Sequence, residues 1–253
     1  MKFAKRLSAF LLVSLLILSC VGCGSKEQSL TVSEGKLTMA TNAHFPPYEY
    51  YEGDKIIGID AEVAGKIAEK LGLELEIADI EFDSIVPGVQ TNKYDMGMAG
   101  MTVTDERKKK VNFSTSYAKG VQVVIVPEDS DIKSLDDLKG KIIGVQQSTT
   151  GDIYISDEFG EENTLKYPNG NIAVEALKNQ KVACVVIDNE PAKAFVAKNE
   201  GLKILDTPYA EEDYAICFSK DNEELQKKVN DALEELIADG TLQSIVDKYI
   251  KSE

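Results

Sequence analysis

Apolar residues in the first part of the chain follow two regular spacings. Alternation of apolar and polar positions, or a short apolar run, predicts strands over residues 36–41, 73–79 and 94–100. Helices are predicted between these strands, over residues 59–71 and 82–93. Strands that alternate with helices indicate an α/β fold built on a parallel sheet.

The same order of elements recurs in the middle of the chain. Strands are predicted over residues 141–147, 164–168 and 182–188, and helices over residues 149–160 and 172–180. Residues 89–100 and 177–188 each combine an apolar helix end, a polar turn with Asn and Lys, and an apolar strand. The repetition predicts two similar lobes rather than an array of short repeats.

Two further strand-like stretches, residues 119–127 and 212–220, flank the second unit. They are followed by a strongly amphipathic helix over residues 222–240 and a short helix that reaches about Ile250. Two strands that join two lobes form a hinge, and a cleft between such lobes is a preferred ligand site.

The simplest arrangement of these elements makes lobe 1 discontinuous. The chain is predicted to leave lobe 1 near Gly120 and to return near Asp213. Lobe 1 then comprises residues 36–121 and 215–253, and lobe 2 comprises residues 122–214.

The N-terminal segment has a pattern of its own. A basic head precedes an apolar run over residues 7–18, which is shorter than the roughly 20 residues of a membrane-spanning helix. This pattern predicts a secretory signal peptide over residues 1–22 and an extracytoplasmic protein. Residues 23–35 are mostly small and polar, and are predicted to form a tether.

Small residues beside a cysteine, in ILSCVGCGS at residues 17–25, resemble the lipobox of bacterial lipoproteins. In that family the cysteine is acylated, becomes the new N-terminus and anchors the protein. Cys23 is favoured because Gly22 precedes it, and Cys20 is the alternative. The resemblance implies a diacylglyceryl anchor in the lipid bilayer at the outer face of the cytoplasmic membrane. An ordinary cleaved signal with incidental cysteines is the other interpretation.

Composition excludes several classes of function. The chain has 43 acidic and 28 basic residues, a net charge of −15, which argues against binding to DNA or RNA. A single histidine excludes sites that need two imidazoles. Cys184 and Cys217 each lie in an apolar run, so we expect two reduced, packed thiols, with a disulfide as the alternative. Neither a metal site nor a cofactor is expected.

Candidate ligand groups follow the predicted strands, because ligands of parallel α/β sheets bind at the carboxyl ends of strands. Phe45 lies in an aromatic loop, and Arg107 lies one turn into a helix, where its guanidinium could grip a carboxylate. Residues 148–151 open a helix whose N–H groups attract an anion. Asp188 ends a strand and is either a helix cap or a partner for a cation. Together these groups match the two charged ends of an α-amino acid.

Five segments then carry a family resemblance: ATNAHFPPYEYYEGDKIIGID, EFDSIVPGVQ, YDMGMAGMTVTDERKKKVNFS, GKIIGVQQSTTGD and VVIDNEPA. As a set, they resemble the polar amino-acid family of solute-binding proteins of bacterial ABC importers. The resemblance implies a two-lobed α/β fold of the periplasmic-binding-protein type II, with a discontinuous first lobe and two hinge strands. It also implies a monomer that captures an amino acid by hinge closure and delivers it to an ABC permease.

The resemblance implies roles for positions in lobe 1. Phe45 and Phe82 would sandwich the side chain of the ligand, and Asn42 would tune its identity. The residues that would hold the carboxylate or ammonium group are Gly100, Met101 and Thr102. Relatives selective for cationic amino acids often carry an acid near the position of Asn42, so the asparagine favours a polar, uncharged L-amino acid.

Further roles are implied across the cleft. Arg107 would grip the ligand carboxylate, aided by Thr149 and Thr150, and Asp188 would hold the ammonium group. Gln146 would tune specificity together with the lobe 1 asparagine. Among departures from the family pattern, Ser148 replaces the usual glycine of its loop and Ala183 replaces a frequent aspartate.

Two other functions compete with transport. An enzyme on the same fold, similar to cyclohexadienyl dehydratases, would need a general acid, for which Asp188 and Glu49 are the candidates. An amino-acid sensor is the second alternative. We expect a binding protein and no enzyme.

Overall fold

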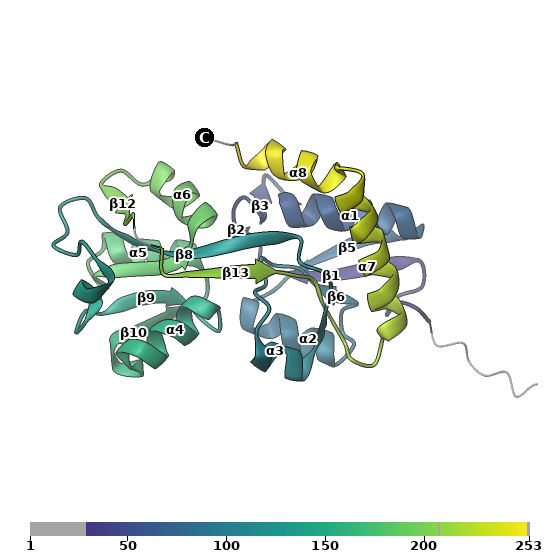
Figure 1. Ribbon diagram of the computed structural model, residues 1–253, viewed down its shortest axis with the longest axis horizontal. Coiled ribbons are helices and arrows are strands. Elements are labelled where there is room, and N and C mark those ends of the chain that lie inside the picture. Colours follow the sequence, from purple (N-terminus) through teal and green to yellow (C-terminus); the bar gives the residue numbers. More distant parts are fainter. Residues whose placement is uncertain (1–28, 207, 252–253) are drawn as a thin grey trace, which may run out of the picture.

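A computed structural model describes residues 29–206 and 208–251. The chain forms two α/β lobes connected by long strands (Figure 1). The predicted signal peptide, both candidate lipidation sites and residues 23–28 of the tether lie outside the described residues. Within the described ranges, no helix has the length and apolar character that crossing a bilayer requires.

Lobe 1 is built on a five-stranded sheet of order β5-β1-β6-β14-β7. Its strands are β1 (Lys36–Thr41), β5 (Glu74–Asp79), β6 (Met96–Gly97), β7 (Asn112–Phe113) and β14 (Cys217–Phe218). Strand β1 runs parallel to β5 and β6, whereas β14 is antiparallel to β6 and β7. The sheet therefore combines segments from both ends of the described chain.

Helices cover both faces of this sheet. They are α1 (Ile59–Leu71), a 3₁₀ turn (Phe82–Ser84), α2 (Ile85–Gln90), α3 (Asp105–Lys110), α7 (Glu223–Ala238) and α8 (Thr241–Tyr249). The C-terminal helices α7 and α8, yellow in Figure 1, pack against α1. Leu37 and Met39 of β1 face these three helices, and Ala40 faces α2, as the two-residue period of a strand requires.

Lobe 2 is built on a sheet of order β10-β9-β11-β8-β12, with β13 also paired to β8. Its strands are β8 (Ala118–Pro127), β9 (Ile143–Gln146), β10 (Thr164–Tyr167), β11 (Cys184–Asp188), β12 (Leu202–Ile204) and β13 (Ala210–Tyr214). Its helices are α4 (Thr150–Phe159), α5 (Gly170–Lys178) and α6 (Asn189–Lys198), with 3₁₀ turns at Leu135–Leu138 and Glu161–Asn163. Strands β9, β10 and β11 are parallel, so their carboxyl ends meet at one edge.

Strands β8 and β13 form the hinge. They pair antiparallel from Ala118 with Tyr214 to Gln122 with Ala210, and both run between the lobes (Figure 1). The strand predicted over residues 212–220 is wrong as a single element, because β13 ends at Tyr214 and β14 starts at Cys217. The chain leaves one sheet at this point and enters the other, which one continuous strand cannot do.

Two other local predictions need correction. The strand predicted over residues 94–100 is reduced to β6, and the helix predicted over residues 82–93 ends at Gln90. A small antiparallel sheet occupies the region in which the sequence predicted only an aromatic loop. Its strands are β2 (His44–Phe45), β3 (Glu49–Glu52) and β4 (Lys55–Ile57). Strands of two to four residues are too short to show a period.

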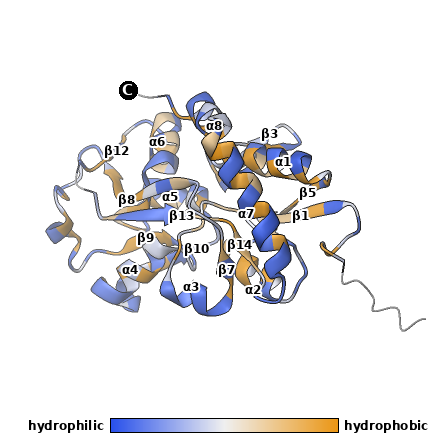
Figure 2. Ribbon diagram, turned by 45° about the vertical axis from the view of Figure 1, so that its right-hand side comes forward, coloured by the Kyte–Doolittle hydropathy of each residue, from blue (hydrophilic) through white to orange (hydrophobic). Residues whose placement is uncertain are grey.

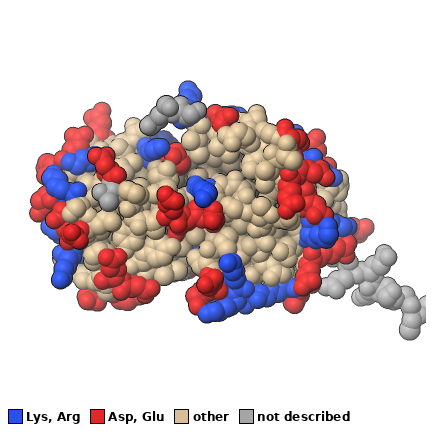
Figure 3. All heavy atoms as spheres, in the orientation of Figure 1, with Lys and Arg blue, Asp and Glu red and all other residues tan. Residues whose placement is uncertain are grey.

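Burial follows the predicted pattern elsewhere. Apolar residues occupy the strands and the inward faces of helices (Figure 2), and acidic side chains are spread over the outer surface, with basic ones among them (Figure 3). Cys184 and Cys217 are buried, free, and lie in different sheets, which confirms the expected packed thiols. Burial raises the pKa of each thiol to about 12, so both are unreactive at neutral pH.

Candidate functional site

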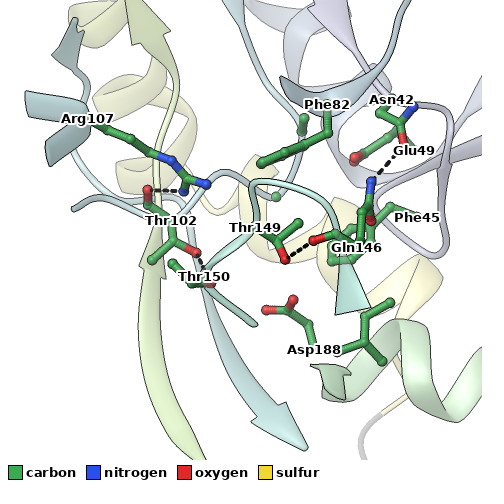
Figure 4. A pocket seen from close by; sticks show the side chains of 13 residues that line it. Asn42, Phe45, Glu49, Phe82, Thr102, Arg107, Gln146, Thr149, Thr150 and Asp188 are labelled. Atoms are coloured by element: carbon green, nitrogen blue, oxygen red, sulfur yellow. Dashed lines mark hydrogen bonds between the residues drawn. The ribbon is translucent and has the colours of Figure 1, made fainter. Parts of the chain in front are cut away.

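A cavity lies between the lobes, where the strands of both sheets end (Figure 4). The residues that line it are Asn42, Phe45, Glu49, Phe82, Ala99, Gly100, Thr102, Arg107, Gln146, Thr149, Thr150, Ile187 and Asp188.

All of the predicted site residues line this cavity except Met101. The side chain of Met101 is fully buried in the lobe 1 core beside Ile85 and Val89. Its neighbours Gly100 and Thr102 line the cavity instead. The prediction that Met101 lies in the site is therefore wrong for its side chain.

Arg107 is held at one end of the cavity. Its helix α3 is capped by Thr104, whose hydroxyl accepts the Arg107 N–H at 3.1 Å. The guanidinium donates from Nη1 to the Thr102 carbonyl at 2.7 Å and from Nη2 to the Ser148 carbonyl at 3.0 Å, and it lies 5.3 Å from the centre of the Phe82 ring. Arg107 is buried without a carboxylate partner among the described residues, so it can receive an anionic ligand group.

The loop before α4 supplies the polar wall opposite. Thr149 caps α4 by accepting the Asp152 N–H at 3.3 Å, and its hydroxyl donates to the Gln146 carbonyl at 2.8 Å. The Ser148 N–H already donates to the Asp152 carboxylate at 2.8 Å. Ser148 has φ +63, a conformation that favours glycine, which explains the physical preference for glycine in this loop. Of the predicted anion loop, the buried Thr150 hydroxyl lines the cavity, where it lies 3.5 Å from the Thr102 hydroxyl and accepts from Gln122 Nε2 at 3.4 Å.

Asp188 lies on the lobe 2 side of the cavity, at the carboxyl end of β11. It precedes α6 but makes no side-chain cap, which excludes the helix-cap alternative. Its carboxylate accepts a hydrogen bond from the Tyr214 hydroxyl of the hinge strand. Burial, and then the negative charge of Glu212, raise the pKa of Asp188 to about 7. A cationic group in the cavity would compensate this buried charge.

The other end of the cavity is formed by Asn42, Gln146 and Glu49. Asn42 donates to the Ile80 carbonyl at 2.8 Å and accepts from Gln146 Nε2 at 3.1 Å. Glu49 was considered from the sequence only as a catalytic acid, yet its side chain lines the cavity. It is 1 % exposed, and no N–H or hydroxyl of the described residues donates to either of its carboxyl oxygens. Burial, and then the nearby Asp60, raise the pKa of Glu49 well above its ordinary value.

The lobes are closed on each other around this cavity. Arg107 reaches Ser148, Asn42 reaches Gln146, and Gln147 Nε2 donates to Asp83 Oδ2 at 2.7 Å, each bond joining lobe 1 to lobe 2. Closure excludes water from the charged groups and strengthens their interaction with a ligand.

Comparison with known proteins agrees with this architecture. The sequence model of the bacterial extracellular solute-binding proteins, family 3, matches residues 37–252. The chain belongs to this family. The predicted resemblance and the extracytoplasmic location are thereby confirmed at the level of the family, which is extracellular.

Individual relatives are similar over most of their length. The arginine-binding extracellular protein ArtP of Bacillus subtilis is 34% identical over 94% of this chain and 97% of its own. The ABC transporter arginine-binding protein 1 of Escherichia coli is 33% identical over 85% and 90%. The solved structure of an ancestral arginine-binding protein bound to glutamine has a TM-score of 0.83 and 39% identity, and covers 87% of this chain and 100% of its own. These relatives confirm the two-lobed type II fold and support the predicted class, an amino-acid-binding component of an ABC transporter.

The hinge provides a first prediction. A Cβ on Gly120 of β8 would lie 2.1 Å from the Tyr214 hydroxyl, so Gly120→Ala should displace that ring from Asp188. Overpacking of this kind costs about 1–3 kcal/mol, and we expect amino-acid affinity to fall roughly tenfold by calorimetry.

The matched control for the hinge substitution is Gly65→Ala. Gly65 lies in α1, and a Cβ there meets nothing within 4 Å. This variant should keep its affinity and gain about 0.5–1 kcal/mol of stability in thermal unfolding. Equal affinities of the two variants would show that Gly120 does not position the Tyr214–Asp188 pair.

Proposed function

We propose that this protein captures a cationic L-α-amino acid, with arginine as the best ligand, and delivers it to an ABC permease. The single observation that carries the proposal is the buried carboxyl group of Glu49 in the wall of the cavity. The sequence favoured a polar, uncharged ligand because Asn42 is not an acid. Glu49, the first residue of β3, supplies an acid at the same end of the cavity as Asn42.

The charges of the cavity support a cationic side chain. Glu49 and Asp188 line the cavity together with one cation, Arg107. The carboxylate and ammonium groups of an amino acid would pair with Arg107 and Asp188, which leaves Glu49 to be compensated by the side chain. A neutral side chain would leave the Glu49 carboxyl group protonated and without an ion pair, whereas a cationic side chain would gain a buried carboxylate partner.

The shape of the cavity supports the same assignment. Arg107 lies at one end and Glu49 at the other, with Asp188 on the wall between them (Figure 4). An amino acid whose backbone groups meet Arg107 and Asp188 therefore directs its side chain towards Glu49. Phe45 and Phe82 flank this path, and aromatic rings stack well on the planar guanidinium of arginine.

Relatives support the ligand class. ArtP and the Escherichia coli protein are arginine-binding by name, and the ancestral arginine-binding protein was solved with glutamine. We therefore expect arginine to bind most tightly here and glutamine to bind more weakly. The proposal includes a lipid anchor at Cys23 or Cys20, a monomer, and no covalent chemistry. Incubation with prephenate or arogenate should yield no product, and product formation would favour the dehydratase alternative.

The test of the proposal is a ligand screen on the protein and a Glu49→Gln variant. A ligand that binds only the folded protein raises its melting temperature. Among the twenty amino acids, arginine should give the largest shift with the unchanged protein. In Glu49→Gln the shift by arginine should fall, because its guanidinium loses a carboxylate partner, and glutamine should give the larger shift.

The control is Glu52→Gln, an exposed acid on the same strand β3. It should leave the order of ligands unchanged. If arginine gives no shift with the unchanged protein, or if Glu49→Gln keeps the full preference for arginine, the proposed ligand class is wrong.

A further inference from the structure

A pair of buried acids lies at the end of the cavity, outside the groups that meet the backbone of an amino acid. Glu49 and Asp60 are 1% and 0% exposed. The two residues are neighbours in the fold, because the Asp60 N–H donates to the carbonyl of Tyr48, which precedes Glu49, and the negative charge of Asp60 helps to raise the pKa of Glu49. Asp60 Oδ2 accepts the Gly100 N–H at 2.9 Å and the Tyr117 hydroxyl at 2.8 Å. No protein N–H or hydroxyl among the described residues reaches Asp60 Oδ1 or either oxygen of Glu49.

Gly58 brings the two acids together. It has φ +125, and a Cβ there would lie 2.2 Å from the Tyr48 carbonyl oxygen. The chain before α1 therefore runs close against the segment that precedes β3, and the Asp60 N–H donates to the Tyr48 carbonyl at 2.9 Å. Glu49 follows Tyr48 directly, so the backbone holds Glu49 and Asp60 as neighbours, and both side chains are buried there.

Two adjacent buried carboxylates without a cation cannot both be ionised at low cost. The groups that act on the pair are acids and phenols: Asp79, Asp188, Tyr48 and Tyr117. On the strands beside β3, His44 and Lys55 lie at positions that are not buried. Arg107 is engaged with Thr102 and Ser148 at the opposite end of the cavity. Burial raises the pKa of both acids, that of Asp60 to about 6, in agreement with a proton held between them.

We infer that Glu49 and Asp60 share one proton when the cavity is empty, and that a cationic ligand side chain displaces this proton. The inference rests on the proposed function, since it requires a cationic ligand. In the step, the Glu49 carboxylic acid loses its proton to solvent and its carboxylate pairs with the side-chain cation. No other bond forms or breaks. A neutral side chain leaves the proton in place and can accept a hydrogen bond from it.

The sign of the pH dependence follows from this exchange. Protons compete with a cationic side chain for Glu49, so lowering the pH from about 8 to about 5.5 should weaken arginine binding. Asp188 also titrates, but it meets the ammonium group of every amino acid. Its contribution is therefore common to all ligands. The difference between a cationic and a neutral ligand isolates the Glu49–Asp60 pair.

The experiment is calorimetry with L-arginine and its neutral isostere L-citrulline, each titrated in buffers with different heats of ionisation. The dependence of the binding enthalpy on the buffer gives the number of protons released. At about pH 7, arginine should release roughly one proton more than citrulline. In Glu49→Gln, arginine should release roughly one proton fewer than it does from the unchanged protein, whereas Glu52→Gln should retain the full release.

A second variant keeps the test informative if Glu49→Gln folds poorly. Asn in place of Asp60 can still accept from Gly100 and Tyr117 but no longer holds a negative charge beside Glu49, so Asp60→Asn should reduce the excess proton release. Equal proton release for arginine and citrulline from pH 5.5 to about 8 would overturn the shared proton and leave the ligand class standing. Absence of arginine binding at every pH would overturn the ligand class and, with it, this inference.

Discussion

Replacing Arg107 by alanine is expected to abolish most amino-acid binding while the fold survives. The guanidinium is the only basic side chain among the residues that line the cavity, and it is buried without a carboxylate partner among the described residues. Loss of one partner of a buried, hydrogen-bonded charge pair costs about 2–5 kcal/mol, which corresponds to a loss of roughly thirtyfold to several-thousandfold in affinity. Arg107→Lys should recover only part of this loss, because an ammonium group lacks the planar fork.

Calorimetry with L-arginine measures the loss, and thermal unfolding of the empty protein checks the fold. The control is Lys109→Ala, which removes an exposed cation from the same helix α3. It should bind as the unchanged protein does. Unchanged affinity of Arg107→Ala for L-arginine would show that Arg107 does not bind the ligand carboxylate.

Replacing Asp188 by asparagine is the second large change. The amide keeps the shape and can still accept from the Tyr214 hydroxyl, but it loses the charge that the ammonium group of the ligand needs. We expect about 2–3 kcal/mol of lost binding, which is roughly thirtyfold to more than a hundredfold. The loss should extend to every amino acid, whereas Glu49→Gln should affect cationic ligands alone.

Stability of the empty variant separates binding from folding. Burial raises the pKa of Asp188 to about 7. The contribution of this group to the free energy of unfolding is therefore fully present below the ordinary pKa of an aspartate, and it is lost as the pH rises towards 7. An asparagine does not ionise, so the empty Asp188→Asn variant should be at least as stable as the unchanged protein at neutral pH. Asp213→Asn, an exposed acid on the hinge strand β13, is the control. Equal affinity of the two variants for arginine would remove Asp188 from the site.

Long periodic segments of the sequence predict most of the fold. Helix α7 and strand β1 bury regular apolar faces, and the structure places both within a residue or two of the predicted bounds. The split of the second hinge segment at Ala215 and Ile216 could not be predicted, because both residues are as buried as a continuous strand would make them. Which sheet each half joins depends on contacts between distant parts of the chain.

Some site residues can be recognised from the local sequence, and others depend on contacts between distant parts of the chain. Arg107 and Asp188 follow recognisable helix and strand ends, and both reach the cavity. The side chain of Met101 lies in the lobe 1 core, after a bend at Gly100, where φ is +51. Glu49 is different, because a charged residue in the run PPYEYY resembles an exposed loop position. Its burial depends on contacts between β3 and distant parts of the chain, such as the close approach of Gly58 to Tyr48, and these contacts leave no local sequence signal.

The most direct test of a cation-binding cleft is the affinity of the unchanged protein for L-arginine and for L-citrulline at neutral pH, measured by calorimetry. The two ligands share their backbone groups and nearly the same shape, so Arg107, Asp188 and the aromatic walls contribute equally to both. They differ in the charge that faces Glu49. We predict one site that binds arginine at least about tenfold more tightly, a difference of about 1.4 kcal/mol. Equal or tighter binding of citrulline would contradict a cation-binding cleft.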